Sequence, residues 1–161
     1  EIKNMINVLA SETFSAVSAP IQYAAIKAYE NDHSNYINKS RNILCAVGNY
    51  VYENVKWKKV RINKPQGGFY LIPELLNKKF NSSSEMCDSI LNDTGVALLP
   101  GSDFGFAQTQ MLARLSFTDF DGQEFMSKIK DNKKIDNDHI AKFAPKVVEG
   151  VDKLKKWSES I

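Results

Sequence analysis

The stretch MLARLSFTDFDG, residues 111–122, places one arginine inside an apolar segment. We expect residues 111–118 to form a strand with buried apolar side chains such as Leu115 and Phe117. Arg114 stands among them, and an arginine is almost never fully buried unless another group pairs with its charge. The residues by themselves favour an ion pair within the protein, and a carboxylate ligand held by the guanidinium fork is the alternative.

Three more short strands are predicted upstream, because these segments are rich in β-branched or aromatic residues and end at turn residues. They cover residues 57–63, 68–74 and 96–100. Pro73 should end the second of them or lie at a sheet edge, since proline has no N–H to donate. A helix over residues 84–94 separates the second and third strands, with Gly95 as its C-terminal stop.

The longest helical pattern runs from Ser34 to Val55, with apolar residues spaced three and four apart. Gly48 weakens this helix by about 1 kcal/mol relative to alanine without ending it. The remaining helical segments are predicted at residues 2–9, from Pro20 to about residue 30, at 121–132 and at 137–157. Residues 11–19 are predicted as a loop, and Pro145 should kink the last helix or start a second one. The fold class expected is mixed α/β (α+β), with a small, mainly antiparallel sheet, helices packed on one face, and a long helix before it.

Composition excludes several classes of protein. The 161 residues are 43% hydrophobic and 25% charged, with a net charge of +2, so we expect a folded chain with no strong field for nucleic acid or an acidic membrane. No apolar run approaches the roughly 20 residues that a membrane span needs, and we do not expect the opening residues to act as a signal peptide. Cys45 and Cys87 have no metal-binding spacing and are expected to be reduced thiols of a cytoplasmic protein. The chain opens on Glu1, which suggests a cut from a longer polypeptide.

The polar residue patterns do not assemble a catalytic centre on their own. His33 and His139 lie at expected helix starts, where capping or solvent exposure is favoured, and neither a catalytic triad nor a metal site is predicted. The basic run at 56–64 is better explained by a strand with a solvated face than by nucleic-acid binding. Asp121 follows the Arg114 strand as a helix cap, and it is the candidate for a protein partner of that arginine.

Four segments, in order, resemble one family. SETFSAVSAPIQYAA (11–25), KPQGGFYLIPEL (64–75), CDSILNDTGVALLPGSDFG (87–105) and ARLSFTDFDG (113–122) are similar to the C-terminal third of class I/II aminotransferases. These are fold-type I enzymes that use pyridoxal 5'-phosphate (PLP). The resemblance covers about residues 1–130, while the polar KDNKKIDND stretch after it departs from the family pattern.

The resemblance implies roles for particular residues. In such enzymes the arginine that matches Arg114 binds the α-carboxylate of the amino acid or 2-oxo acid. Gly67 and Gly68 match a part of the small domain that faces the substrate, so Gly68 is a predicted substrate-binding residue. Residues 100–105 match a loop near the entrance of the site. In the homodimers of this family, a loop that carries Phe14 and Ser15 here reaches the active site of the second subunit.

The resemblance also implies a division of the chain. Residues 1–32 would be a helix-loop-helix remnant of the large PLP-binding domain, and residues 33–161 would be the small domain. The lysine that forms the Schiff base with PLP lies, in this family, before the point that matches Glu1. We therefore expect this chain to bind no PLP and to catalyse no transamination alone. A stand-alone domain that binds carboxylate metabolites or has a regulatory role is the alternative.

Overall fold

A computed structural model of the protein describes residues 1–13, 16–76, 79–129 and 134–161. The chain divides into two compact units, residues 1–35 and 36–161. Each unit is described below by itself.

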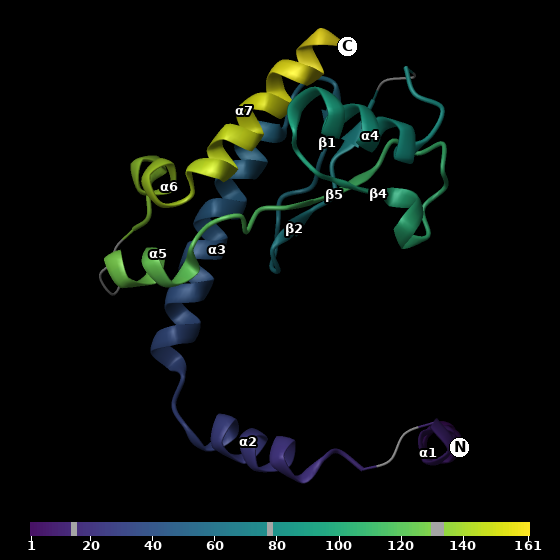
Figure 1. The fold of residues 1–161 in the computed structure, drawn as a ribbon, viewed down its shortest axis with the longest axis vertical. Helices are drawn as coiled ribbons and strands as arrows, with labels where there is room; N and C mark the ends of the chain where they lie inside the picture. The colour runs from purple at the N-terminus through teal and green to yellow at the C-terminus, as the bar shows by residue number, and fades with distance from the viewer. Residues whose placement is uncertain (14–15, 77–78, 130–133) are drawn as a thin grey trace. The chain divides into compact units, whose positions relative to one another are not determined.

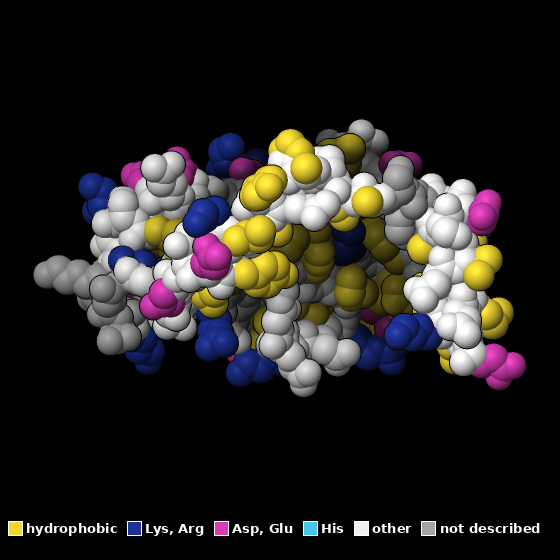
Figure 2. Space-filling model, turned by 90° about the horizontal axis from the view of Figure 1, so that it is seen from below, with side chains coloured by type: hydrophobic (Ala, Val, Ile, Leu, Met, Phe, Trp, Pro, Cys, Tyr) yellow, Lys and Arg dark blue, Asp and Glu magenta, His cyan; other side chains and the backbone are white. Residues whose placement is uncertain are grey.

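The described residues of the first unit form helices α1 and α2, and neither helix buries a side chain. Helix α1 spans Ile2–Thr13 and α2 spans Ala19–Glu30, with Pro20 in its first turn. The prediction that α1 ends at residue 9 is wrong: the hydroxyl of Ser11 donates to the carbonyl of Val8, and that of Thr13 to the carbonyl of Leu9. These bonds let polar residues continue a helix that their composition argued against. Apolar side chains of both helices, such as Ile6 and Ile21, are exposed, and Figure 2 shows hydrophobic side chains on the face of the molecule seen from below.

The second unit begins within the long helix α3, Ser34–Val55, whose bounds the sequence predicted. The helices that follow it along the chain are α4 (Ser83–Thr94), the 3₁₀ helix η1 (Gly101–Phe104), α5 (Gly122–Lys128), α6 (Asn137–Phe143) and α7 (Pro145–Ser160). Gly95 ends α4 in the left-handed conformation, and its N–H donates to the carbonyl of Leu91, as its position predicted. Pro145 starts a second segment rather than kinking one helix.

Within the described parts of the chain, five short strands form two antiparallel sheets. They are β1 (Val60–Arg61), β2 (Tyr70–Leu71), β3 (Glu74–Leu75), β4 (Leu99–Pro100) and β5 (Ala113–Ser116). Strand β5 is the centre of a three-stranded sheet, between β2 and β4, while β1 pairs with β3. The antiparallel sheets and the helices confirm the predicted fold class, although each strand is shorter than predicted.

Pro73 explains why one predicted strand becomes two. It separates β2 from β3, and because it has no N–H it offers only its carbonyl, which accepts from the N–H of Ala113. The N–H of Leu75 then donates to the carbonyl of Met111. The segment therefore continues beside the approach to β5 although it is no longer one regular strand.

The core of this unit lies against one face of β5. Ala113, Leu115 and Phe117 are buried there, together with residues of α3, α4 and α7. Gly48 of α3 is needed for this packing, because a Cβ at that position would lie 2.9 Å from Cζ of Phe117. In Figure 1, α4 and α7 lie above β4 and β5. Among the described residues, no helix is long and apolar enough to cross a membrane.

Candidate functional site

The two faces of β5 carry different kinds of side chain. Ala113 and Leu115 are buried, whereas Arg114 between them is partly buried and Ser116 is exposed. The register places Tyr70 of β2 opposite Ser116, and Leu99 of β4 opposite Arg114. Directly paired residues of antiparallel strands share a face of the sheet. Arg114 therefore lies on the open face, which explains how a charged side chain fits between two buried ones.

The guanidinium of Arg114 contacts aromatic rings instead of a protein carboxylate. Its Cζ atom lies 4.5 Å from the ring centroid of Tyr70 and 4.5 Å from that of Phe104. Among the described residues, none of the ion pairs involves Arg114. Asp121, the candidate partner, instead caps α5 by accepting from the N–H of Glu124 at 2.9 Å. The ion pair with Asp121 is therefore not formed.

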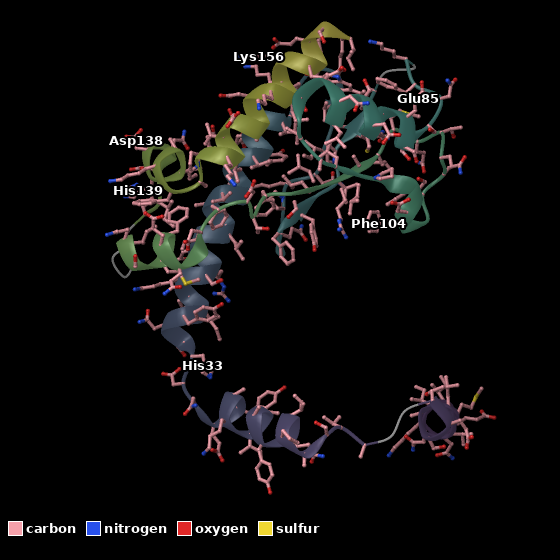
Figure 3. The ribbon with its side chains drawn as sticks, viewed as in Figure 1. His33, Glu85, Phe104, Asp138, His139 and Lys156 are labelled. Atoms are coloured by element: carbon pink, nitrogen blue, oxygen red, sulfur yellow. The ribbon has the colours of Figure 1, made fainter. Side chains whose placement is uncertain are left out.

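Phe104 is brought to this face by the tight turn after β4, and Figure 3 shows it on η1 beneath the strands. The N–H of Gly101 donates to the carbonyl of Leu112 at 2.8 Å. A Cβ at Gly101 would lie 2.8 Å from Cβ of Leu112, so only glycine fits at this contact. Gly105 ends η1 at a φ of 84°. The glycines of PGSDFG thus form a turn with close backbone approach.

Gly68 precedes β2, the strand that carries Tyr70. It has a φ of 70° and is exposed just before β2. Gly67 and Gly68 line a surface pocket together with Arg41 and Cys45 of α3, and Arg114 is not among its lining residues. The structure brings Tyr70, two residues further on, to Arg114. A substrate contact of Gly68 stays a prediction.

Phe14 and Ser15, predicted in the loop that reaches the second subunit, lie outside the described residues. Their role stays a prediction.

The other polar candidates have local structural roles. His139 lies in the first turn of α6, where its N–H donates to Asp136, and in Figure 3 it lies on the opposite side of the unit from Phe104. In the described ranges, no group of three His, Cys, Asp or Glu side chains is placed to hold a metal ion. In the basic run, Lys56 pairs with Glu53 and Arg61 with Glu74. These partners explain two of its charges without a phosphate ligand.

Sequence reasoning missed Tyr70 and Phe104 as neighbours of Arg114. Both residues stand in segments that resemble the family, but nothing in their spacing marks a contact with an arginine that is ten residues from Phe104 and 44 residues from Tyr70. Strand register was the available signal for Tyr70, because a residue two positions along the partner strand is a diagonal neighbour. Phe104 gave no such signal, because η1 was predicted as loop.

Comparisons with known proteins place the chain among aminotransferases. The family model described as aminotransferase class I and II matches residues 1–129. The chain belongs to this family. It is 32% identical to an aspartate aminotransferase of Bacillus sp. strain YM-2 over 114 residues, which are 68% of this chain and 29% of that protein. It is also 32% identical to an aspartate aminotransferase of Thermotoga maritima over 106 residues, or 65% of this chain and 26% of that protein.

A solved structure agrees with the family. The crystal structure of an aspartate aminotransferase from Thermotoga maritima aligns with 92% of this chain and 31% of its own chain, at 26% identity and a TM-score of 0.61. The chain thus spans about a quarter to a third of the length of these aminotransferases. The predicted resemblance to class I/II aminotransferases is confirmed.

The family implies PLP, but the described residues do not make a site that fits it. A Schiff base needs an amine shielded from bulk water beside the substrate, and every described lysine except Lys39 is exposed. Lys39 lies in the second turn of α3, and among the residues that the structure describes no lysine contacts the Tyr70 or Phe104 ring beside Arg114. The described residues therefore offer a cation for a carboxylate, and none of their lysines lies beside that cation in a setting that suits a Schiff base.

Proposed function

We propose that this chain is the C-terminal, small-domain part of a PLP-dependent aminotransferase, which transfers an amino group between an amino acid and a 2-oxo acid. One observation carries the proposal. In a chain of this family, Arg114 lies on the open face of β5 without a protein carboxylate among the described residues. A guanidinium in that setting has N–H donors to offer to the α-carboxylate of a substrate.

The rest of the chain has supporting roles in this proposal. Residues 1–32 belong to the large domain and residues 33–161 form the small domain, which moves to close the site and exclude water. Gly68 faces the substrate, and residues 100–105 lie near the entrance. Phe14 and Ser15 reach the second subunit of a homodimer. The enzyme works in the cytoplasm, with neither a membrane nor nucleic acid as a partner.

The cofactor belongs to the part of the enzyme outside this chain. PLP supplies the electron sink for amino-group transfer when it is bound. This chain contributes the arginine that fixes the orientation of the substrate. The 161 residues alone are therefore expected to be inactive, since the described lysines do not provide the Schiff-base group.

The arginine is tested by Arg114→Leu in the full-length enzyme. Losing two charge-assisted hydrogen bonds, about 1.5 kcal/mol each, should lower kcat/KM about 100-fold and raise KM for every amino acid substrate. Steady-state kinetics with acidic, apolar and polar amino acids measure this effect. An unchanged KM, or an effect limited to one substrate class, would contradict a shared role in α-carboxylate binding.

The proposal that the cofactor is held outside this chain is tested on the 161-residue chain itself. We expect no PLP absorbance band after incubation with the cofactor and no transaminase turnover. A clear band together with turnover would overturn the proposal that this chain lacks the cofactor-holding part. Binding of 2-oxo acids with micromolar affinity by the chain alone would favour the stand-alone carboxylate-binding domain.

A further inference from the structure

Two aromatic rings from separate elements contact the same guanidinium. Tyr70 comes from β2 and Phe104 from η1, and each ring centroid lies 4.5 Å from Cζ of Arg114. We call Tyr70 and Phe104 the aromatic clamp. Both rings are partly open to solvent, with exposed fractions of 39% and 43%. Their position is therefore not explained by burial in the core.

Backbone geometry fixes the Tyr70 side of the clamp. The register pairs Tyr70 with Ser116, which makes Tyr70 the diagonal neighbour of Arg114 on the same face. The Tyr70 ring in turn contacts the ring of Phe69, with centroids 4.1 Å apart. The tyrosine is thus held by its strand and by a second aromatic residue.

Glycine contacts in the turn that includes η1 fix the position of Phe104, the second residue of the aromatic clamp. Gly101 packs against the backbone of Leu112, two residues before Arg114, and anchors the start of η1. Gly105 turns the chain back at a positive φ, and its N–H donates to carbonyls of Gly101 and Ser102. The turn that carries Phe104 is therefore attached to the strand that carries Arg114.

Stacking and hydrogen bonding use different parts of a guanidinium. An aromatic face attracts the cation through the π system, while the N–H donors lie at the edge of the guanidinium plane. Two ring contacts restrict the rotamers of a long side chain without occupying the donors that a carboxylate needs. A preorganised fork loses less conformational entropy when it binds.

We infer that Tyr70 and Phe104 are positioning residues that hold the Arg114 guanidinium ready for a carboxylate. This inference rests on the proposed function, because it concerns the arginine that the proposal assigns to the substrate. The clamp acts through Arg114 and needs no contact of its own with the substrate.

The test uses Phe104→Leu in the full-length holoenzyme, with Phe106→Leu as the matched control. Phe106 lies on the same turn and is 42% exposed, close to the 43% of Phe104, and it is not in contact with Arg114 through its ring. We expect Phe104→Leu to raise KM for amino acids about fivefold to tenfold, with a smaller change in kcat, as loss of a partly desolvated cation–π contact implies. Phe104→Tyr should restore the KM, and Phe106→Leu should leave it within twofold.

A double-mutant cycle with Arg114→Leu separates positioning from a general structural effect. If the clamp acts through the arginine, Phe104→Leu adds no further rise in KM once Arg114 is leucine. A further rise in that background, or an unchanged KM for Phe104→Leu alone, would overturn the clamp and leave the proposed function standing. An unchanged KM for Arg114→Leu would instead remove the proposed function itself.

A second pair of variants, both at Tyr70, keeps the test valid if Phe104→Leu misfolds. If Phe104→Leu does not fold, Tyr70→Leu is compared with Tyr70→Phe, which keeps the ring. A raised KM in the leucine variant together with a near-native KM in the phenylalanine variant supports the clamp. Equal KM values in the two variants contradict it.

Discussion

The two faces of β5 differ in what their side chains do: alternate residues either pack into the core or lie on the open face, where we propose that Arg114 binds substrate. Leu115 is buried, and Phe117 just after the strand is 1% exposed against α3. Arg114 and Ser116 point the other way, where Tyr70 and Phe104 stand. Side chains alternate strictly along a strand, so a rigid core on one side fixes the position of an arginine on the other. Substitutions on the buried face should therefore change the free energy of unfolding, whereas substitution of Arg114 on the open face should change the enzyme kinetics.

The largest effect is expected on the buried face. Phe117→Ala should lower the free energy of unfolding by about 3–5 kcal/mol, because it leaves a cavity between β5 and α3. Chemical denaturation of the 161-residue chain measures this value. Ser116→Ala, one residue away on the exposed face, is the control and should change the stability by no more than about 0.5 kcal/mol. Similar losses for both variants would contradict the division between the faces.

A smaller effect sharpens the same comparison at the helix that covers the buried face. Gly48→Ala should lower the free energy of unfolding by about 1–3 kcal/mol, because the new Cβ would lie 2.9 Å from the Phe117 ring. Gly150→Ala in α7 is the matched control, since its Cβ would meet Val96 at an ordinary 3.8 Å. That variant should gain about 0.5–1 kcal/mol from helix propensity. Denaturation curves that shift in the same direction for both variants would count against close packing at Gly48.

The smallest effect concerns pH and a buried thiol of α4. Burial raises the pKa of Cys87 to about 11, from an ordinary value of 9.0, and the nearby charges of Asp88 and Asp103 add to this. The unfolded thiol ionises first as pH rises, while the folded thiol keeps its proton. The stability that Cys87 contributes is therefore complete below about pH 9 and is lost between pH 9 and 11.

Cys87→Val isolates this contribution from that of other groups that titrate in the same range. Thermal unfolding is compared for both proteins at pH 8 and pH 10.5. The stability of the wild-type chain should fall more steeply with pH than that of the variant. Parallel pH profiles would show that Cys87 ionises equally in the folded and unfolded chains.

The sequence predicted those parts of the fold that depend on local pattern. The spacing of apolar residues set the bounds of α3, and Gly95 marked the end of α4. Strand lengths could not be read in the same way, because an apolar or alternating run does not show where its hydrogen-bonding partner ends. The run at 57–63 contains only the two residues of β1.

The candidate site could likewise be predicted only in part from the sequence. Arg114 stood out in the sequence because a charge among apolar residues needs an explanation. The contacts of Arg114 with two aromatic rings could not be recognised in the sequence. The Tyr70 contact depends on strand register, and the Phe104 contact depends on a 3₁₀ turn anchored at Gly101. Contacts between distant segments are set by tertiary packing, which a single sequence does not display.

The role proposed for Arg114 is tested most directly by a crystal structure of the full-length protein with a substrate or 2-oxo acid analogue bound. If Arg114 binds the substrate, both oxygens of the α-carboxylate should lie within hydrogen-bonding distance, about 2.7–2.9 Å, of its guanidinium nitrogens. The rings of Tyr70 and Phe104 should still contact that guanidinium. An α-carboxylate held by another cation, with Arg114 turned away from it, would contradict the role proposed for Arg114.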